Sequence, residues 1–486
     1  MDEMNVIIAG AGIAGLTCSI ALARHKRVKV TILERFPDIG PVGNGIQVPC
    51  NAAHVMRKLG LLNQMLKKAG GPATATPSMN YSDGSVLLTR DFTRCEEWYG
   101  APWLLIHRAD YMKILYEEAR ALGVQVKFGC EIQEVDFEAP WVKLASGEIH
   151  TADVIIGSDG TSFQPMRRLK STIRSALHPS IRPRRTESFA YRAMFPITQL
   201  TSPTLQHILN PSACLFWLGP RTQIVLYALR GGQVFNLVVV VSDPPFNARC
   251  KEGDALALLR ERLSDCDPAV RELMDAAQEL VCFPLLELED LPFWTRGHVT
   301  LMGDAAHPTL PHLGQGAAMC VEDGLVLGNL LGRMAERVNS GSSRGTLKSG
   351  IPAVLESYES IRHARTTRIV SQSRLAGIYS ELPRGPAQRA RDAEALDYDE
   401  RSCISNWPWI DSRWNRELLA YRAGDVAERE FERLVDEGAL DEVHGDRDES
   451  RALTRRCSAP GVVMDKSWSQ VVLDRVLRLK DSCAFM

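Results

Sequence analysis

The pattern of apolar and polar residues predicts a strand, a tight turn and a helix at the start of the chain. Residues 6–8 are an apolar, β-branched run, three glycines follow at once, and the next segment is rich in Ala and Leu with helical spacing. A second apolar run, residues 28–33, predicts another strand and ends at Glu34. This order of elements is typical of an α/β fold.

The three glycines and Glu34 have the spacing of a dinucleotide-binding site. Gly10 permits the turn, Gly12 lets a pyrophosphate approach the backbone, and Gly15 lets the helix pack on the strand. The helix N-terminus then faces the phosphates. A carboxylate about twenty residues past the glycines is placed to bind an adenosine ribose. The alternative is a glycine-rich turn without a ligand, and the register of both strands, the helix and Glu34 favours dinucleotide binding.

The next 150 residues alternate between helical and strand patterns. Residues 72–103 contain short alternating segments, with Asp83-Gly84 as a hairpin signal, and Asn51 is a candidate cap for the helix before them. Arg108 begins a further helix, where a guanidinium can reach a phosphate. On position alone, the alternative of a surface charge at the start of a helix is favoured for Arg108.

The middle of the chain is different in kind. Residues 180–285 contain strand-like runs separated by turn residues, which predicts an inserted antiparallel sheet able to cover a pocket, and residues 254–280 predict one helix. The strand at 299–302 then ends at Gly303-Asp304, before a Pro-rich loop and a long glycine-led helix. Residues 351–438 have a predominantly helical pattern, interrupted by a Trp-rich stretch.

Composition and charge exclude some classes of partner. The 57 basic and 59 acidic side chains nearly cancel, so no overall field would attract nucleic acid or an anionic membrane. Twelve scattered cysteines without CxxC pairs suit a reducing compartment. No run is long and apolar enough for a membrane helix, and the acidic N-terminus is unlike a signal peptide. We therefore expect a cytoplasmic protein, with a homodimer as an open alternative to a monomer.

Several separated motifs together resemble the single-component FAD-dependent aromatic monooxygenases, and more narrowly their fungal salicylate hydroxylase-like group. The motifs are GAGIAG with Glu34, GNGIQVPCNA, HRADYMKIL, DVIIGSDG, AYR and LMGDAAHPTLPHLGQGAAMCVEDG. They occur in the family's order, and the likeness runs from Met4 to about Gly438.

The resemblance implies an α/β protein: a Rossmann-like FAD-binding fold with an inserted antiparallel β-sheet substrate domain and a helical C-terminal region. The expected parts are a first FAD-binding part at 1–178, which includes the β-rich segment at 72–103, a substrate-binding sheet at 179–285, a second FAD-binding part at 286–345, a helical region at 346–438 and a tail of unknown role at 439–486. It also implies NAD(P)H as co-substrate, O2 and an aromatic small molecule as substrates, and no nucleic acid.

The resemblance also implies roles for particular residues. On the cofactor side, Glu34 would hold the adenosine ribose, Gly45 would lie by the flavin, Arg108 would reach the phosphates, Asp304 the ribityl chain, and Gly316 and Ala317 the isoalloxazine edge. Arg192 and Tyr227 match pocket positions, where Arg192 would bind a phenolate, carboxylate or carbonyl oxygen and Tyr227 would share that work. The alternatives are a structural ion pair for Arg192 and a sheet-surface aromatic for Tyr227. His307 is interpreted as a structural histidine rather than a catalytic base.

Two segments depart from the family pattern. Residues 162–169 separate Asp159-Gly160 from Ser171 to Arg174, where the family has a continuous motif, so they are interpreted as an insertion. The tail ends in Cys483-Ala484-Phe485-Met486, which has the outline of a prenylation box, although Phe485 is a poor fit to it.

The sequence as a whole predicts an FAD-dependent, NAD(P)H-consuming monooxygenase that hydroxylates or epoxidises an aromatic compound of the phenolic, salicylate-like, polyketide or indole type, in fungal secondary metabolism or aromatic catabolism. A flavin-dependent oxidase or dehydrogenase and a non-catalytic FAD-binding protein are the alternatives.

Overall fold

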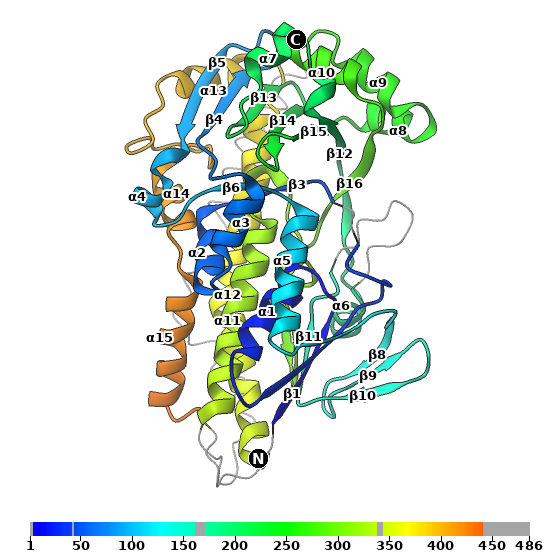
Figure 1. The fold of residues 1–486 in the computed structure, drawn as a ribbon, viewed down its shortest axis with the longest axis vertical. Coiled ribbons are helices and arrows are strands. Elements are labelled where there is room, and N and C mark those ends of the chain that lie inside the picture. Colours follow the sequence, from blue (N-terminus) through cyan, green and yellow to red (C-terminus); the bar gives the residue numbers. More distant parts are fainter. Residues whose placement is uncertain (1–2, 41–42, 161–170, 338–343, 441–486) are drawn as a thin grey trace.

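The computed structural model describes residues 3–40, 43–160, 171–337 and 344–440. The insertion at 162–169 and almost all of the tail, including Cys483, lie outside these residues. Figure 1 shows a lower part built on a parallel sheet, an upper part built on an antiparallel sheet, and long helices that run beside both.

The lower part is a six-stranded sheet in the order β17-β18-β11-β1-β2-β7. Its strands are β1 (Met4–Ala9), β2 (Val28–Leu33), β7 (Gln125–Lys127), β11 (Val154–Gly157), β17 (Thr295–Arg296) and β18 (Val299–Leu301). All neighbours are parallel except β17 and β18. Because β1 lies between β2 and β11, the carboxyl end of β1 is a topological switch point, the usual place for a ligand in such a sheet.

Helices cover this sheet and connect its strands. They are α1 (Ile13–Ala23), α5 (Arg108–Ala121), α6 (Thr172–Leu177) and α11 (Gly316–Arg337). A small antiparallel sheet of β8 (Ile132–Asp136), β9 (Trp141–Leu144) and β10 (Ile149–Thr151) lies beside it. The predicted Rossmann-like fold is therefore confirmed.

The upper part is a seven-stranded sheet in the order β16-β12-β15-β14-β13-β4-β5. Its strands are β4 (Ala75–Asn80), β5 (Val86–Asp91), β12 (Arg184–Pro196), β13 (Cys214–Gly219), β14 (Thr222–Leu229), β15 (Val234–Val241) and β16 (Val281–Glu287). The hairpin expected at Asp83-Gly84 joins β4 to β5, and Gly84 has a φ of +70°. These two strands extend the upper sheet, because β4 pairs with the edge of β13.

Side chains of the upper sheet alternate between two faces. The near face, which includes Arg192, Val225, Tyr227, Asn236 and Val238, packs toward the lower part, and the far face is covered by helices. Its far-face residues, such as Tyr191, Trp217, Leu226 and Leu237, form a separate apolar core.

The far-face helices are α7 (Pro203–Ile208), α8 (Pro244–Glu252), α9 (Ala255–Arg262) and α10 (Pro268–Ala276). The prediction of a single helix at 254–280 is therefore wrong, because two helices lie there. The segment is broken because Asp267 caps a new helix whose first residue is Pro268, and proline lacks the N–H that a helix interior needs.

Short elements lie between the two sheets. They are the strand pair β3 (Gly45–Val48) and β6 (Leu104–His107), and the helices α2 (Cys50–Lys58), α3 (Leu62–Ala69) and α4 (Cys95–Tyr99), with single turns of 3₁₀ helix at Phe92–Arg94, Gly303–Ala305 and Pro311–Leu313. A further 3₁₀ turn, Ile197–Gln199, packs against the far-face core of the upper sheet. The predicted helical C-terminal region is present as α12 (Arg344–Ser380), α13 (Pro386–Leu396), α14 (Ser412–Leu419) and α15 (Ala423–Asp436).

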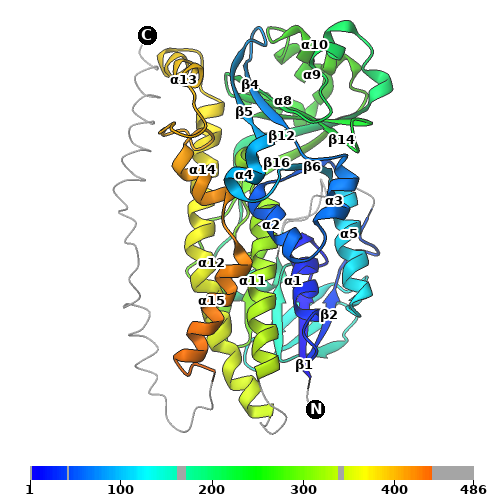
Figure 2. The same cartoon turned by 60° about the vertical axis from the view of Figure 1, so that its left-hand side comes forward.

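Figure 2 shows that α12 runs the length of the molecule. It contacts β17 in the lower sheet and β14 in the upper sheet, so it ties the two parts together. Among the described residues, no helix combines the length and the apolar character needed to cross a membrane.

Candidate active site

The glycine turn after β1 has the geometry that the sequence predicts. Gly10 has a φ of +102°, and a Cβ there would lie 2.7 Å from the backbone oxygen of Ser158. A Cβ on Gly15 would lie 2.2 Å from the oxygen of Gly10, so this glycine allows α1 to pack on the turn. Gly12, the N-cap of α1, faces open space and has no side-chain cap. The first turn of α1 thus offers uncapped amides to an anion.

The Glu34 carboxylate lies beside this turn. Its Oε2 accepts a hydrogen bond of 2.7 Å from the Ala11 N–H, and its Oε1 accepts one of 3.0 Å from the Phe36 N–H. The side chain is buried at the carboxyl end of β2. A carboxylate has further lone pairs, so Glu34 can still accept hydrogen bonds from a ribose while the backbone holds it in place.

Arg108 and Asp304 lie near one another. Arg108 begins α5, and Asp304 follows β18. Burial lowers the pKa of Arg108, and the charge of Asp304 acts in the opposite direction, so the two side chains lie within electrostatic reach of one another. The backbone oxygens of Asp304 and Ala305 accept hydrogen bonds from Arg174.

The two halves of the motif that the insertion separates in sequence are in direct contact in the structure. The Asp159 carboxylate accepts hydrogen bonds from the Ser171 hydroxyl and the N–H of Thr172, both 2.5 Å, and from the N–H of Ile173, 3.2 Å. Asp159 therefore caps α6 although eleven residues separate it from Ser171. The two halves of the family motif come together, and Arg174 reaches the Asp304 segment as described above.

Strand β3 contacts the upper sheet. The Gly45 N–H donates a 3.0 Å hydrogen bond to Oδ1 of Asn236. A Cβ on Gly45 would lie 2.5 Å from the Tyr227 ring, so only glycine fits against this tyrosine. On the other side, Gly314 lies against Gln47, and α11 begins at Gly316 with Ala317 in its first turn. The cofactor-side candidates Gly45, Gly316 and Ala317 therefore lie on adjoining elements.

Arg192 and Tyr227 project from the same, near face of the upper sheet. Burial lowers the pKa of Arg192; Tyr227 opposes that shift and the nearby charge of Arg108 adds to it. Burial raises the pKa of Tyr227 above its usual range, against the charge of Arg192. The Arg192 Nε is buried without a hydrogen-bond partner among the described residues. Arg108, Arg192 and Tyr227 thus share one space next to Gly45.

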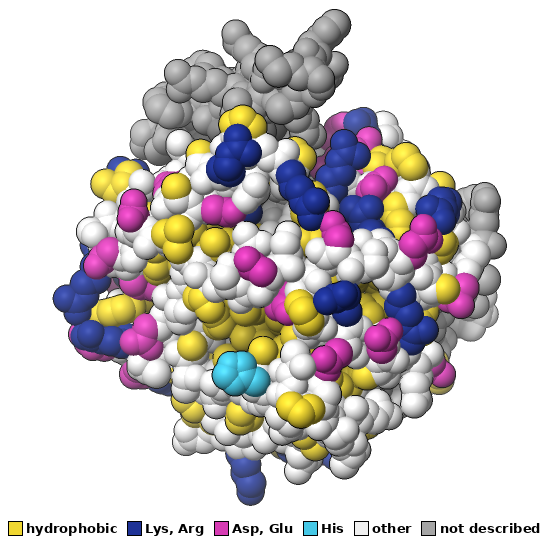
Figure 3. Space-filling view, turned by 90° about the horizontal axis from the view of Figure 1, so that it is seen from above, with side chains coloured by type: hydrophobic (Ala, Val, Ile, Leu, Met, Phe, Trp, Pro, Cys, Tyr) yellow, Lys and Arg dark blue, Asp and Glu magenta, His cyan; other side chains and the backbone are white. Residues whose placement is uncertain are grey.

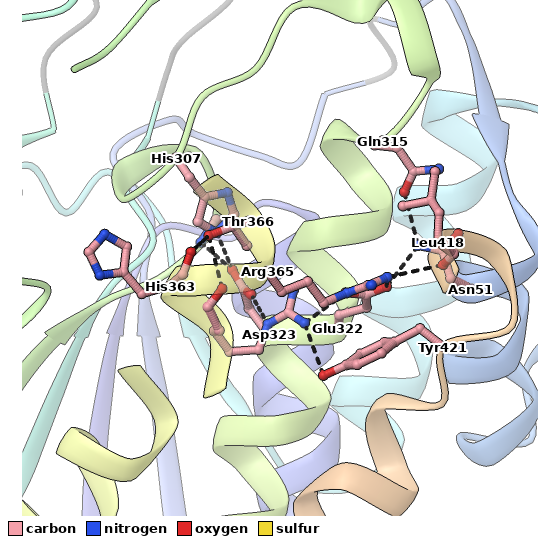
Figure 4. Close-up of polar contacts among 12 residues, drawn as sticks. Asn51, His307, Gln315, Glu322, Asp323, His363, Arg365, Thr366, Leu418 and Tyr421 are labelled. Atoms are coloured by element: carbon pink, nitrogen blue, oxygen red, sulfur yellow. Dashed lines mark hydrogen bonds and ion pairs between the residues drawn. The ribbon is translucent and has the colours of Figure 1, made fainter. Parts of the chain in front are cut away.

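His307 lies in a buried network of charged groups, shown in Figure 4. Its Nε2 is 2.6 Å from Asp323 Oδ2, and Asp323 accepts hydrogen bonds from Gly303 N–H and Arg362. Burial raises the pKa of Asp323, but His307 and Arg362 outweigh that effect and the net shift is downward. These contacts support the structural interpretation of His307.

The same network reaches the first turn of α11 through Asn51. Its Nδ2 donates to Oε1 of Gln315 at 2.9 Å and to Oε1 of Glu322 at 2.7 Å, and Arg365 pairs with Glu322. The prediction of Asn51 as a helix cap is therefore wrong: α2 begins at Cys50, its N-cap is Pro49, and Asn51 points into the core. Asn51, Gln315 and Asn236 were not predicted as site residues, because each makes its contacts with residues far away in the sequence.

These features fit FAD. They include an uncapped helix start for the pyrophosphate, a fixed carboxylate for a ribose, and buried donors at Arg192 Nε, Asn236 Nδ2 and Gln315 Nε2 that have no partner among the described residues. Buried polar atoms without partners are rare in folded proteins, and a bound ligand is a common reason for them.

On the face seen in Figure 3, acidic and basic side chains are interspersed around small groups of apolar ones.

Comparisons with known proteins identify the family of the chain. The profile of the FAD binding domain family matches residues 3–223 and 291–373. An FAD-dependent monooxygenase of Beauveria bassiana, OpS4, is 32% identical over 427 residues, covering 84% of this chain and 95% of the relative. A 3-hydroxybenzoate 6-hydroxylase of Polaromonas naphthalenivorans is 32% identical over 422 residues, covering 83% of this chain and 96% of that enzyme.

Solved structures show the same fold. A salicylate hydroxylase in complex with substrate has a TM-score of 0.67 at 24% identity, covering 88% of this chain and 98% of that one. CtdE in complex with FAD and a substrate has a TM-score of 0.69 at 20% identity, covering 89% of this chain and 99% of that one.

The chain therefore belongs to the FAD binding domain family. Within it, the chain's relatives are FAD-dependent monooxygenases of aromatic compounds.

Proposed function

We propose that this protein uses FAD, NAD(P)H and O2 to hydroxylate or epoxidise an aromatic small molecule whose oxygen substituent binds at Arg192. The observation that carries the proposal is the half-buried Arg192 side chain on the near face, beside Tyr227 and Gly45; its Nε is buried and has no partner among the described residues. A guanidinium that pairs with no carboxylate in the described part of the chain suits a phenolate, carboxylate or carbonyl oxygen of the substrate.

The proposed roles of the other residues follow from their positions. The first turn of α1 and Arg108 bind the cofactor phosphates, Glu34 the adenosine ribose and Asp304 the ribityl chain, while Gly45, Gly316 and Ala317 border the flavin. Bound FAD, once reduced by NAD(P)H, supplies the activation of O2. The chain itself binds and orients the substrate, and the elements between the two sheets exclude water from it.

Tyr227 acts as a hydrogen-bond donor in this proposal. Burial raises its pKa, so the phenol keeps its proton at neutral pH and donates it in a hydrogen bond to the substrate oxygen. Arg192 and Tyr227 together orient the ring against the near face, next to Gly45, which would border the flavin, and the shape of the near face selects the position that reacts. The chemistry of the relatives, which act on hydroxybenzoates, is consistent with an oxygen-bearing aromatic ring.

The test is turnover of the FAD-loaded protein with a panel of hydroxybenzoates, phenols and indoles. We expect one compound to accelerate NAD(P)H oxidation and to take up one atom from ¹⁸O-labelled O2. Release of peroxide without labelled product would favour an oxidase, and failure of NAD(P)H to reduce the flavin with any compound would favour a non-catalytic FAD-binding protein.

Arg192→Met tests the binding role directly. We expect the variant to keep its FAD spectrum and to lose about 10- to 100-fold in kcat/KM, the value of a charge-assisted hydrogen bond. Arg185→Met is the matched control, because Arg185 lies on the same strand and is exposed. Full activity of Arg192→Met would remove Arg192 from the site.

The proposal places the enzyme in the cytoplasm and leaves a homodimer to be tested by sedimentation. None of the ten cysteines within the described residues forms a disulfide, as is usual in a reducing compartment.

A further inference from the structure

Asn236 is a buried polar residue between the two proposed substrate-binding residues. It lies on the near face in β15, directly opposite Tyr227 of β14, while Arg192 of β12 pairs with Val238, two residues further along β15. Arg192, Asn236 and Tyr227 therefore form a diagonal across three adjacent strands. Side chains in such direct and diagonal positions lie within reach of one another.

The two polar atoms of the Asn236 amide have different surroundings. Its Oδ1 accepts the 3.0 Å hydrogen bond from the Gly45 N–H, which joins residues 191 positions apart. Its Nδ2 is buried and has no partner among the described residues. The side chain is fully buried, with Val238 and Val240 next to it on the same face. An apolar residue would leave the Gly45 N–H without its acceptor, so fold stability accounts for the Oδ1. It does not account for the Nδ2, which is a buried donor that has no partner among the described residues.

The hydrogen bond to Gly45 has a structural consequence for the site. Gly45 lies so close to Tyr227 that a Cβ would overlap the ring. Asn236 therefore holds β3, on the cofactor side, in one register against the tyrosine on the substrate side. No other hydrogen bond between β3 and the upper sheet is present in the described part of the chain.

We propose that Asn236 is a third polar residue of the ligand pocket: its Oδ1 fixes β3 against Tyr227, and its Nδ2 donates a hydrogen bond to an acceptor oxygen of the bound ligand. The oxygen belongs either to the flavin ring or to the substrate, and both offer the same chemistry. The inference rests on the proposed function for the substrate and on FAD binding for the cofactor.

Two variants separate the two halves of the amide. Asn236→Asp keeps the acceptor for Gly45 and removes the donor, whereas Asn236→Leu removes both at similar volume. Asn247→Leu is the matched control, because Asn247 is a buried asparagine of the same domain whose contacts, to Tyr191, Glu187 and Val241, all lie away from the near face. The control should lower the melting temperature and leave ligand binding unchanged.

The measurements are the Kd of FAD, from quenching of flavin fluorescence on the apoprotein, and the Kd of a substrate, from its effect on the flavin spectrum. A rise of about tenfold in the substrate Kd of Asn236→Asp, with an unchanged FAD Kd, places the oxygen on the substrate. A rise of that size in the FAD Kd, with a shifted flavin spectrum before substrate is added, places it on the flavin.

Asn236→Leu should weaken FAD binding further than Asn236→Asp, because β3 also loses its anchor. The inference is overturned if both Asn236 variants bind FAD and substrate like the unaltered protein and change only the melting temperature, as the control does. Failure of the proposed function would give a different result. The unaltered protein would then turn over none of the compounds, while the difference in FAD Kd between it and the Asn236 variants would still test the role of Asn236.

Discussion

The two faces of the upper sheet differ in whether their buried polar groups have hydrogen-bond partners. On the far face, Tyr191 donates a 2.8 Å hydrogen bond to Asn247, and the Trp217 Nε1 donates one of 2.7 Å to Asp267. On the near face, Arg192 Nε and Asn236 Nδ2 are buried without partners in the described part of the protein. The same strands supply both faces, since successive side chains point to opposite sides.

The difference separates stability from binding within one sheet. A polar group with a partner contributes to the free energy of unfolding, whereas a buried one without a partner opposes folding until a ligand supplies the partner. Substitutions on the far face should therefore change stability alone, and those on the near face should change ligand binding and turnover.

The largest expected effect is on the far face, for Trp217→Ala. The indole is fully buried and bonded to Asp267, so its removal leaves a cavity and an unpaired carboxylate oxygen. We expect the free energy of unfolding, measured in urea, to fall by about 3–5 kcal/mol. The folded variant should keep its kcat/KM, and a selective loss of turnover under folding conditions would contradict the separation of the two faces.

A smaller effect is expected for Glu381, a buried carboxylate that lies by the start of β14 and the end of β15 and outside the proposed site. Its Oε1 is buried without a hydrogen bond among the described residues and is 3.9 Å from Nδ1 of His312. Burial raises the pKa of Glu381 to about 7, although the Ser242 hydroxyl and Arg262 act to lower it. Burial lowers the pKa of His312 to about 4, so His312 is neutral at the pH where Glu381 titrates.

The folded protein thus holds a proton on Glu381 that the unfolded chain releases above pH of about 4.5. Its contribution to stability is complete below that pH and is lost as the pH rises through about 7, by about 3 kcal/mol in all. Glu381→Gln should stabilise the protein at pH 8 and leave it nearly unchanged at pH 4.5, as melting curves at the two pH values will show. Equal effects at both pH values would rule out this titration.

The smallest effect, and the most direct comparison, comes from a pair of tyrosine variants. Tyr191→Phe on the far face should cost about 1 kcal/mol of stability and leave turnover unchanged, because it removes one satisfied hydrogen bond. Tyr227→Phe on the near face should leave the melting temperature unchanged and lower kcat/KM by about tenfold. The same pattern in both variants would mean that Tyr227 is merely a packing residue.

The parts that the sequence predicts best are those whose causes are local. The glycine turn and Glu34 belong to one continuous unit of strand, helix and strand, so their spacing in the sequence is enough to place them. The family resemblance singles out Arg192 and Tyr227, and the alternation of side chains along the strands then puts both on one face of the sheet. The sheet contact of β4 with β13 and the break before Pro268 depend on partners that spacing does not reveal.

Asn51 and Asn236 show the limit most clearly. Asn51 has the local pattern of a helix cap, yet its amide bonds to residues more than 260 positions away, and Asn236 looks like one polar residue in an apolar strand. Their contacts arise only when the inserted sheet and α11 fold against the start of the chain. A run such as FNLVVVV does carry one signal, which is a single amide at a position where the alternation predicts a buried side chain.

The capping of α6 by Asp159 also has a consequence for protein engineering. The Asp159 carboxylate accepts all three hydrogen bonds that join the two halves of the motif, from Ser171, Thr172 and Ile173. A redesign of this part of the sequence must therefore keep the carboxylate, because an amide or an apolar side chain at position 159 would take a charge-assisted acceptor away from the first turn of α6.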